Sequence, residues 1–155
     1  MRRILPTGAL AVVAAVAGGC SSAREFAEVE GAVTLDGKPL GQVQVVFVPD
    51  ATKGNKGNNA TAFTDAQGQY RLKAERDGKD GTVLGPHRVY FVDLTAVPNL
   101  TGTPPEPGQP ARPSAPGLPL RFPRVYTDLL ETPFKDVEIK SGKQTQNFDL
   151  KSKRP

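Results

Sequence analysis

The sequence predicts an all-β fold, a single β-sandwich of about seven short strands. Several short stretches alternate apolar and polar side chains, which is the period of a half-buried strand. Clusters of Gly, Asp and Asn separate these stretches and are typical of turns. No stretch keeps a helical period over several turns. These three observations together favour strands joined by tight turns.

The first strands lie between Val29 and Pro49. Small or apolar residues alternate with polar ones from residue 29 to 35, and Val43, Val45 and Phe47 repeat the pattern. Between them stands Asp36-Gly37, a strong hairpin signal because glycine supplies the positive φ that a tight turn needs. We therefore expect 29–35 and 43–49 to form a hairpin to which the later strands add.

Five further segments complete the expected fold. Strands are predicted at 60–64, 69–74, 86–94, 134–140 and 144–150, with one helical turn at 128–131. Tyr70, Leu72 and Ala74 are expected on one face, and Phe148 and Leu150 to point inward. The stretch 86–94 is the most apolar and suits a central strand.

A proline-rich insertion interrupts the sandwich at 95–123. It contains nine prolines, whose fixed φ and missing N–H groups exclude helix and sheet. We expect an extended segment between two strands. At the other end of the chain, 151–155 forms a basic, solvated tail.

The N-terminus has the layout of an export signal. Arg2 and Arg3 precede an apolar run at 8–17, which is short for a bilayer span, and small residues lead to Cys20. This arrangement resembles a bacterial lipoprotein signal. The resemblance implies cleavage after residue 19, lipidation of Cys20 and a tether over 20–27. The alternative is an ordinary secreted protein. Cys20 is the sole cysteine, so no internal disulfide is expected.

Three stretches resemble the carboxypeptidase regulatory-like domain. They are EGAVTLDGKPLGQVQVVFVP, TDAQGQYRL and GPHRVYFVDL. The resemblance covers 28–150 and implies a transthyretin-like or immunoglobulin-like sandwich. It implies a structural or binding module and carries over no catalytic residues.

Few residues offer chemistry. His87 lies in phase with Val89 and Phe91, so we interpret it as a structural histidine, although a Ser/His/Asp arrangement with Ser114 or Ser141 is formally possible. Zinc needs three or four ligands, and His87 stands alone.

Five loop aspartates lack calcium-loop spacing, namely Asp36, Asp50, Asp65, Asp77 and Asp80. Asp136 and Glu138 are read as a solvated face. No metal, cofactor or catalytic site is predicted.

Among the tyrosines, Tyr70 and Tyr90 are expected inside the sandwich, which leaves Tyr126 as the exposed aromatic candidate for sugar stacking. After removal of Arg2 and Arg3, 18 basic residues face 16 acidic ones, so the net charge is near +2 and nucleic acid is not expected as a partner.

The sequence thus favours a non-enzymatic binding or scaffolding lipoprotein of the bacterial cell envelope. Its domain would face the periplasm or the exterior. Its partners would be the membrane, through the lipid anchor, and an envelope protein or polysaccharide. A polysaccharide-binding accessory module and a hydrolytic enzyme are the alternatives. The enzyme would require a pocket with perturbed acids or His87.

Overall fold

The computed structural model describes residues 25–76, 78–96 and 118–153. The expected signal peptide, Cys20, Asp77, Ser114 and the centre of the proline-rich insertion lie outside them. Twelve strands are present in the described part. They are β1 (Phe26–Ala27), β2 (Val29–Leu35), β3 (Lys38–Pro39), β4 (Val43–Pro49), β5 (Ala60–Phe63), β6 (Gln69–Arg71), β7 (Lys73–Ala74), β8 (Thr82–Val83), β9 (Gly85–Asp93), β10 (Val137–Ile139), β11 (Gln144–Thr145) and β12 (Phe148–Leu150). Two 3₁₀ turns, η1 (Ala51–Lys53) and η2 (Arg124–Tyr126), are the helical elements among these residues.

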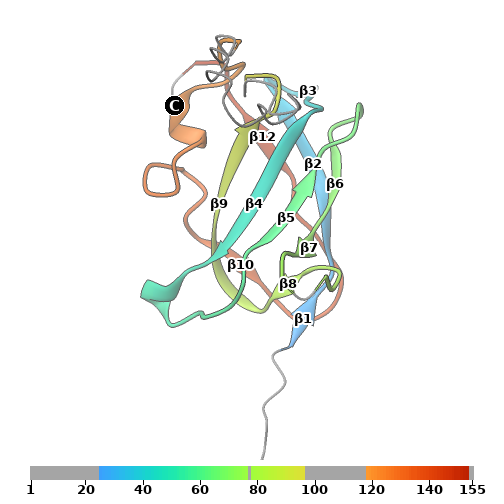
Figure 1. The fold of residues 1–155 in the computed structure, drawn as a ribbon, viewed down its shortest axis with the longest axis vertical. Coiled ribbons are helices and arrows are strands. Elements are labelled where there is room, and N and C mark those ends of the chain that lie inside the picture. Colours follow the sequence, from blue (N-terminus) through green and yellow to red (C-terminus); the bar gives the residue numbers. More distant parts are fainter. Residues whose placement is uncertain (1–24, 77, 97–117, 154–155) are drawn as a thin grey trace, which may run out of the picture.

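The strands form the predicted all-β sandwich (Figure 1). One sheet has the order β10-β9-β4-β5-β7 and is antiparallel throughout. The other is centred on β2, which pairs with β3 and β6 in antiparallel and with β11 and β12 in parallel. A small ribbon of β1 and β8 lies at one end. The second strand of the first sheet, β9, is central, as its apolar sequence predicts.

The predicted hairpin between 29–35 and 43–49 is wrong. The Asp36-Gly37 turn joins β2 only to the two-residue β3, and the chain then crosses to the opposite sheet. Gln42 turns the chain with a φ of 58°. Beyond it, β4 pairs with β5 on one edge and with β9 on the other, so both of its edges are satisfied without β2. The two stretches face each other across the core.

The segment 69–74 connects the sheets at a corner. Its first half, β6, pairs with β2, and its second half, β7, pairs with β5. The break falls at Leu72. Tyr70, Leu72 and Ala74 are buried as the alternation predicts. A strand that changes sheets in this way is the usual means of making a corner in a packed pair of sheets.

The last predicted strand, 144–150, is divided into β11 and β12. Both run parallel to β2 and are separated at Gln146 and Asn147. Here the Asn147 side chain takes the place of a ladder partner, because its Oδ1 accepts the Ala32 N–H at 2.9 Å. The close passage of Gln146 over β2 requires a glycine at position 31, where a Cβ would lie 1.7 Å from the Gln146 carbonyl oxygen.

Aromatic rings fill the core. Phe148 lies 5.4 Å from Phe91 and 4.9 Å from Phe134, measured between ring centroids, in edge-to-face pairs. Tyr126 stacks on Phe134 at 6.0 Å and is buried, so the expectation of an exposed Tyr126 is wrong. The η2 turn directs its ring inward, and its hydroxyl oxygen accepts the Lys151 N–H at 3.2 Å. Tyr90, expected inside, is instead half-buried on the outer face of β9.

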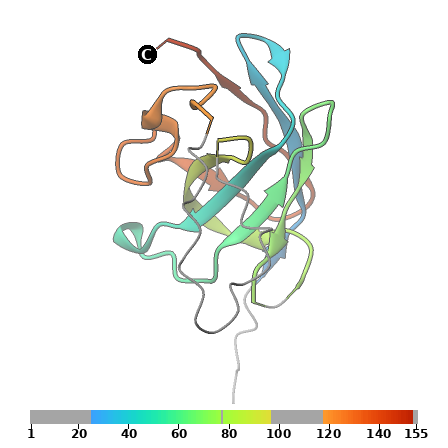
Figure 2. The ribbon, with the colours of Figure 1, turned by 45° about the horizontal axis from the view of Figure 1, so that its top comes forward.

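The returning segment 118–136 covers the side of the sandwich next to β9. Thr132 donates from its hydroxyl to the Val89 carbonyl at 2.6 Å, and the Val89 N–H donates to the Phe134 carbonyl at 2.9 Å. Asp128 begins the expected turn, closed by the Thr132 N–H at 2.9 Å. Figure 2 shows this orange segment on the side opposite the turn that joins β5 and β6.

Candidate functional site

His87 is a buried structural residue, as predicted. Its Nδ1–H donates to the Gly85 carbonyl at 2.9 Å, because that oxygen can only accept. Its Nε2 lies 3.1 Å from the Thr82 hydroxyl, which donates to it when the ring is neutral. Burial lowers the pKa of His87. With both nitrogens bonded inside the fold, the ring is not placed to act on a ligand.

Mild acid is expected to weaken the fold through His87. Its folded pKa lies below the unfolded value of about 6.5, so this stabilisation is complete above pH 6.5 and is lost as the pH falls toward the folded pKa. Between pH 7.5 and 5.0 the free energy of unfolding should fall by up to about 2 kcal/mol. Urea titration at the two pH values measures it. In His87→Gln the His87 contribution to the pH dependence of the free energy of unfolding should disappear. An unchanged pH dependence would show that His87 is not its cause.

The loop aspartates considered for calcium that the structure describes are each hydrogen-bonded or ion-paired to protein groups. Asp50 accepts from Thr52 and Arg88, and Asp65 accepts the N–H groups of Gln67 and Gln69. Asp36 accepts the Ser152 N–H, and Asp80 forms an ion pair with Lys73. Asp136, expected on a solvated face, forms an ion pair with Lys53. Glu138 is exposed. Within the described ranges, no three His, Cys, Asp or Glu side chains gather as a metal site would require.

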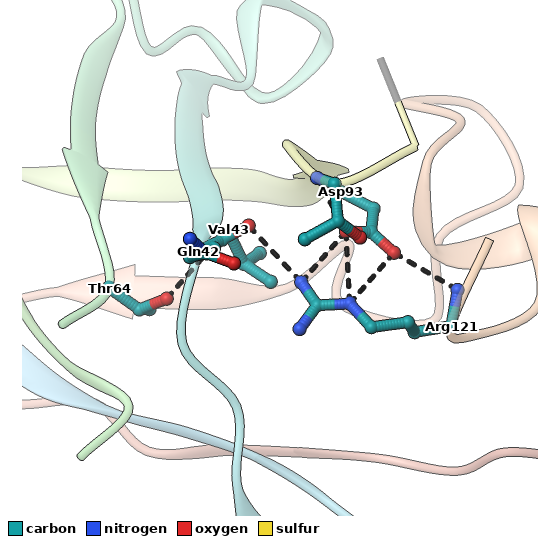
Figure 3. A network of polar contacts seen from close by, with 6 residues as sticks. Gln42, Val43, Thr64, Asp93 and Arg121 are labelled. Atoms are coloured by element: carbon teal, nitrogen blue, oxygen red, sulfur yellow. Dashed lines mark hydrogen bonds and ion pairs between the residues drawn. The ribbon is translucent and has the colours of Figure 1, made fainter. Parts of the chain in front are cut away.

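A buried ion pair that the sequence analysis missed fixes the two ends of the proline-rich insertion (Figure 3). Asp93, at the end of β9, has no exposed side-chain surface. Arg121 donates to it from Nε at 3.0 Å, from Nη2 at 2.7 Å and from its backbone N–H at 3.0 Å. Thr95 donates to the same carboxylate from its N–H at 3.1 Å and its hydroxyl at 2.7 Å. Arg121 also reaches the Gln42 carbonyl at 3.2 Å.

The protonation of Asp93 follows from these bonds. Burial raises its pKa, but the hydrogen bonds from Arg121 and Thr95 outweigh burial and lower the pKa to about 2. The carboxylate is therefore ionised at neutral pH. Its oxygens already accept six hydrogen bonds from five donor groups and lie inside the fold, so this pair has a structural role and leaves no acceptor for a ligand.

An open hollow on the outer face of the β2 sheet is the candidate binding site. We call it the Phe63 groove, and its volume is about 560 Å³. Gly31 and Ala32 of β2 form its floor, and the small outward side chain of Ala32 leaves this part of the face open. Its sides are formed by Phe63 from the end of β5, by Gln69 and Arg71 from β6, and by Asn147 beyond β11.

Phe63 is the unusual member of the groove. Its side chain is 63% exposed, in contrast to the buried Ala60 and Ala62 of the same strand. The alternation that buries the two alanines turns Phe63 to the outer face. A single exposed aromatic ring is common on protein surfaces, but this ring stands at the side of a polar hollow. It gives the groove one apolar surface.

The charges around the Phe63 groove balance one another. Glu30 is bound by Lys143 at 2.9 Å and by Arg71 at 3.3 Å. The hydrogen bond from Lys143 is the main cause of a lowered pKa for Glu30, so its carboxylate stays ionised. Asp65 contributes a second carboxylate, which the turn before β6 already uses. The lining therefore contains two carboxylates and one guanidinium, and Lys143 pairs with Glu30 from outside it, so the groove has no excess of positive charge.

Comparison with protein-family models, with curated proteins and with solved structures finds no match to this chain in any of the three. Across the described ranges, no helix is both long and apolar enough to span a bilayer.

Proposed function

We propose that this protein is a lipid-anchored binding or scaffolding module of a bacterial cell envelope, with no enzymatic activity of its own. The observation that carries the anchor is Cys20, placed after a basic start, an apolar run and small residues. A diacyl or triacyl anchor would hold the domain at a membrane surface, since one chain alone binds only weakly. The finer assignment to a carboxypeptidase regulatory-like, transthyretin-like domain belongs to the same proposal.

The structure supports a binding role through the Phe63 groove. It combines one exposed aromatic ring with polar side chains on a rigid sheet, which is a common composition of recognition surfaces. Of its carboxylates, Glu30 is paired with Lys143 and Asp65 accepts two backbone N–H groups of its own turn, so neither is arranged as a general acid. The expected tether ends at β1, which lies at one end of the sandwich (Figure 1).

Intact mass and membrane fractionation test the anchor. The full chain is expressed in a bacterial host as wild type, as Cys20→Ala and as the matched control Ser21→Ala. We expect wild type and control in the membrane fraction, each with the mass of residues 20–155 plus acyl chains. Cys20→Ala should lose both the added mass and the membrane association. A soluble wild-type protein without acyl chains would refute the anchor.

A further inference from the structure

We propose that the Phe63 groove binds a neutral polysaccharide chain. This inference deepens the proposed function by naming the ligand class of the binding module. Phe63 offers a flat apolar surface, and pyranose rings carry an apolar face of C–H groups that packs on such a surface. The exposed fraction of 63% leaves the ring available for this contact.

Polar groups suited to sugar hydroxyls lie around the same floor. Asn147 uses only its Oδ1 inside the fold, to accept the Ala32 N–H, which leaves its two amide N–H groups directed elsewhere. Among the described residues, no hydrogen bond engages the Gln69 side chain, and it is exposed. A planar amide donates and accepts side by side, and thus matches a pair of neighbouring hydroxyls. The amides and the ring together fit a ligand that is apolar on one face and hydroxylated at its edges.

The charge balance selects a neutral chain. Glu30 and Asp65 offset Arg71 and Lys143, and Glu30 is bound by both cations. A polyanion such as nucleic acid or an acidic glycan needs an excess of Lys and Arg along its path. The groove has no such excess. A neutral glycan does not require these pairs to be broken.

A peptide strand is a poorer fit because the groove offers only a short stretch of free sheet edge. Strand addition needs a row of unpaired backbone N–H and C=O groups. The strand β6 pairs with β2 on one side only, but on its other side the Gln69 N–H and C=O are already hydrogen-bonded to Asp65. Phe63 itself is paired with Gln44 of β4. The side chains of this face therefore determine what it binds.

Calorimetric titration of the full-length chain in detergent tests the proposal. The probes are cellohexaose, chitohexaose, maltohexaose, xylohexaose and laminarihexaose, with an alginate hexasaccharide as the acidic comparison. We expect at least one neutral probe to bind, and Phe63→Ala to weaken that binding about tenfold or more. Phe63→Trp should preserve it, and Gln69→Ala should weaken it several-fold. The control Leu130→Ala, at an exposed leucine in the distant segment 118–136, should leave binding unchanged.

Several results would overturn the glycan assignment: no binding of any neutral probe, equal binding by wild type and Phe63→Ala, or equal binding of the alginate hexasaccharide. Phe63 is exposed, so its variants should fold, and matching circular dichroism spectra check this. A photo-crosslinking residue placed at position 63 provides a further test. If it captures an envelope protein and no glycan binds, the glycan assignment is wrong and the ligand of the binding module is a protein. The titration is repeated with Cys20→Ala, so that loss of the anchor and loss of glycan binding are read separately.

Discussion

Replacing Gly31 with alanine should unfold the domain or destabilise it by at least about 3 kcal/mol. The new Cβ would stand 1.7 Å from the Gln146 carbonyl oxygen and 2.6 Å from its carbonyl carbon. Both are backbone atoms, so the whole link between β11 and β12 would have to move away from β2. That movement would break the 2.7 Å hydrogen bond from the Tyr70 hydroxyl to the Gln146 carbonyl. Urea unfolding followed by far-UV circular dichroism measures the loss.

The control for Gly31→Ala is Gly142→Ala. Position 142 has a φ of 90° and nothing within 4 Å of an added Cβ, so its cost is conformational and should be about 1 kcal/mol. Position 31 has no such φ, and its cost is steric. Equal losses at the two positions would show that β11 and β12 do not pack on β2 as closely as described.

Arg121→Ala is expected to lower the free energy of unfolding by about 3 kcal/mol, since it leaves the Asp93 carboxylate buried without its main partner. Arg124→Ala, at an exposed arginine three residues on, serves as the control and should change stability by less than about 0.5 kcal/mol. Chemical denaturation at pH 7 compares the two. Equal effects would mean that the buried pair contributes no more than a surface arginine.

Acid provides an independent check on the same pair. The folded pKa of Asp93 is about 2, below its ordinary 3.8, so the stabilisation is present above pH 4 and is lost as the pH falls toward 2. The loss amounts to about 2 kcal/mol for this one group. Asp93→Asn removes the titrating carboxylate, and its stability should fall less steeply across that range. If the free energy of unfolding of Asp93→Asn depends on pH as steeply as that of wild type, another group causes the acid sensitivity.

Much of the local structure could be predicted from sequence. Alternation identified which side chains of 69–74 point inward, and it placed Val43, Val45 and Phe47 in the core. It could not identify the partner of each strand. Asp36-Gly37 is a true turn, but whether the chain returns beside β2 or crosses to the other sheet depends on β5 and β9, which come later in the sequence. Such pairings depend on long-range contacts that no local pattern contains.

The site was harder to predict than the fold. Tyr126 remains as the exposed aromatic candidate once Tyr70 and Tyr90 are assigned to the sandwich, but the η2 turn packs it against Phe134. The alternation in 60–64 does carry a signal for Phe63. Ala60 and Ala62 take the inward positions of this strand, so Phe63 falls on an outward position. Asn147 joins the groove only because β11 lies parallel beside β2, and no feature of its own neighbours indicates that position.

The carboxylate of Asp93 also has a consequence for how this chain can vary. It holds Thr95 and Arg121 at a fixed separation, so the number of residues between them contributes a loop-closure entropy that grows slowly with length. Doubling that number costs roughly 0.6 kcal/mol, less than the loss of a single buried methylene. The loop-closure cost of a longer stretch is therefore small, and protein engineers can test this position for displaying foreign peptides.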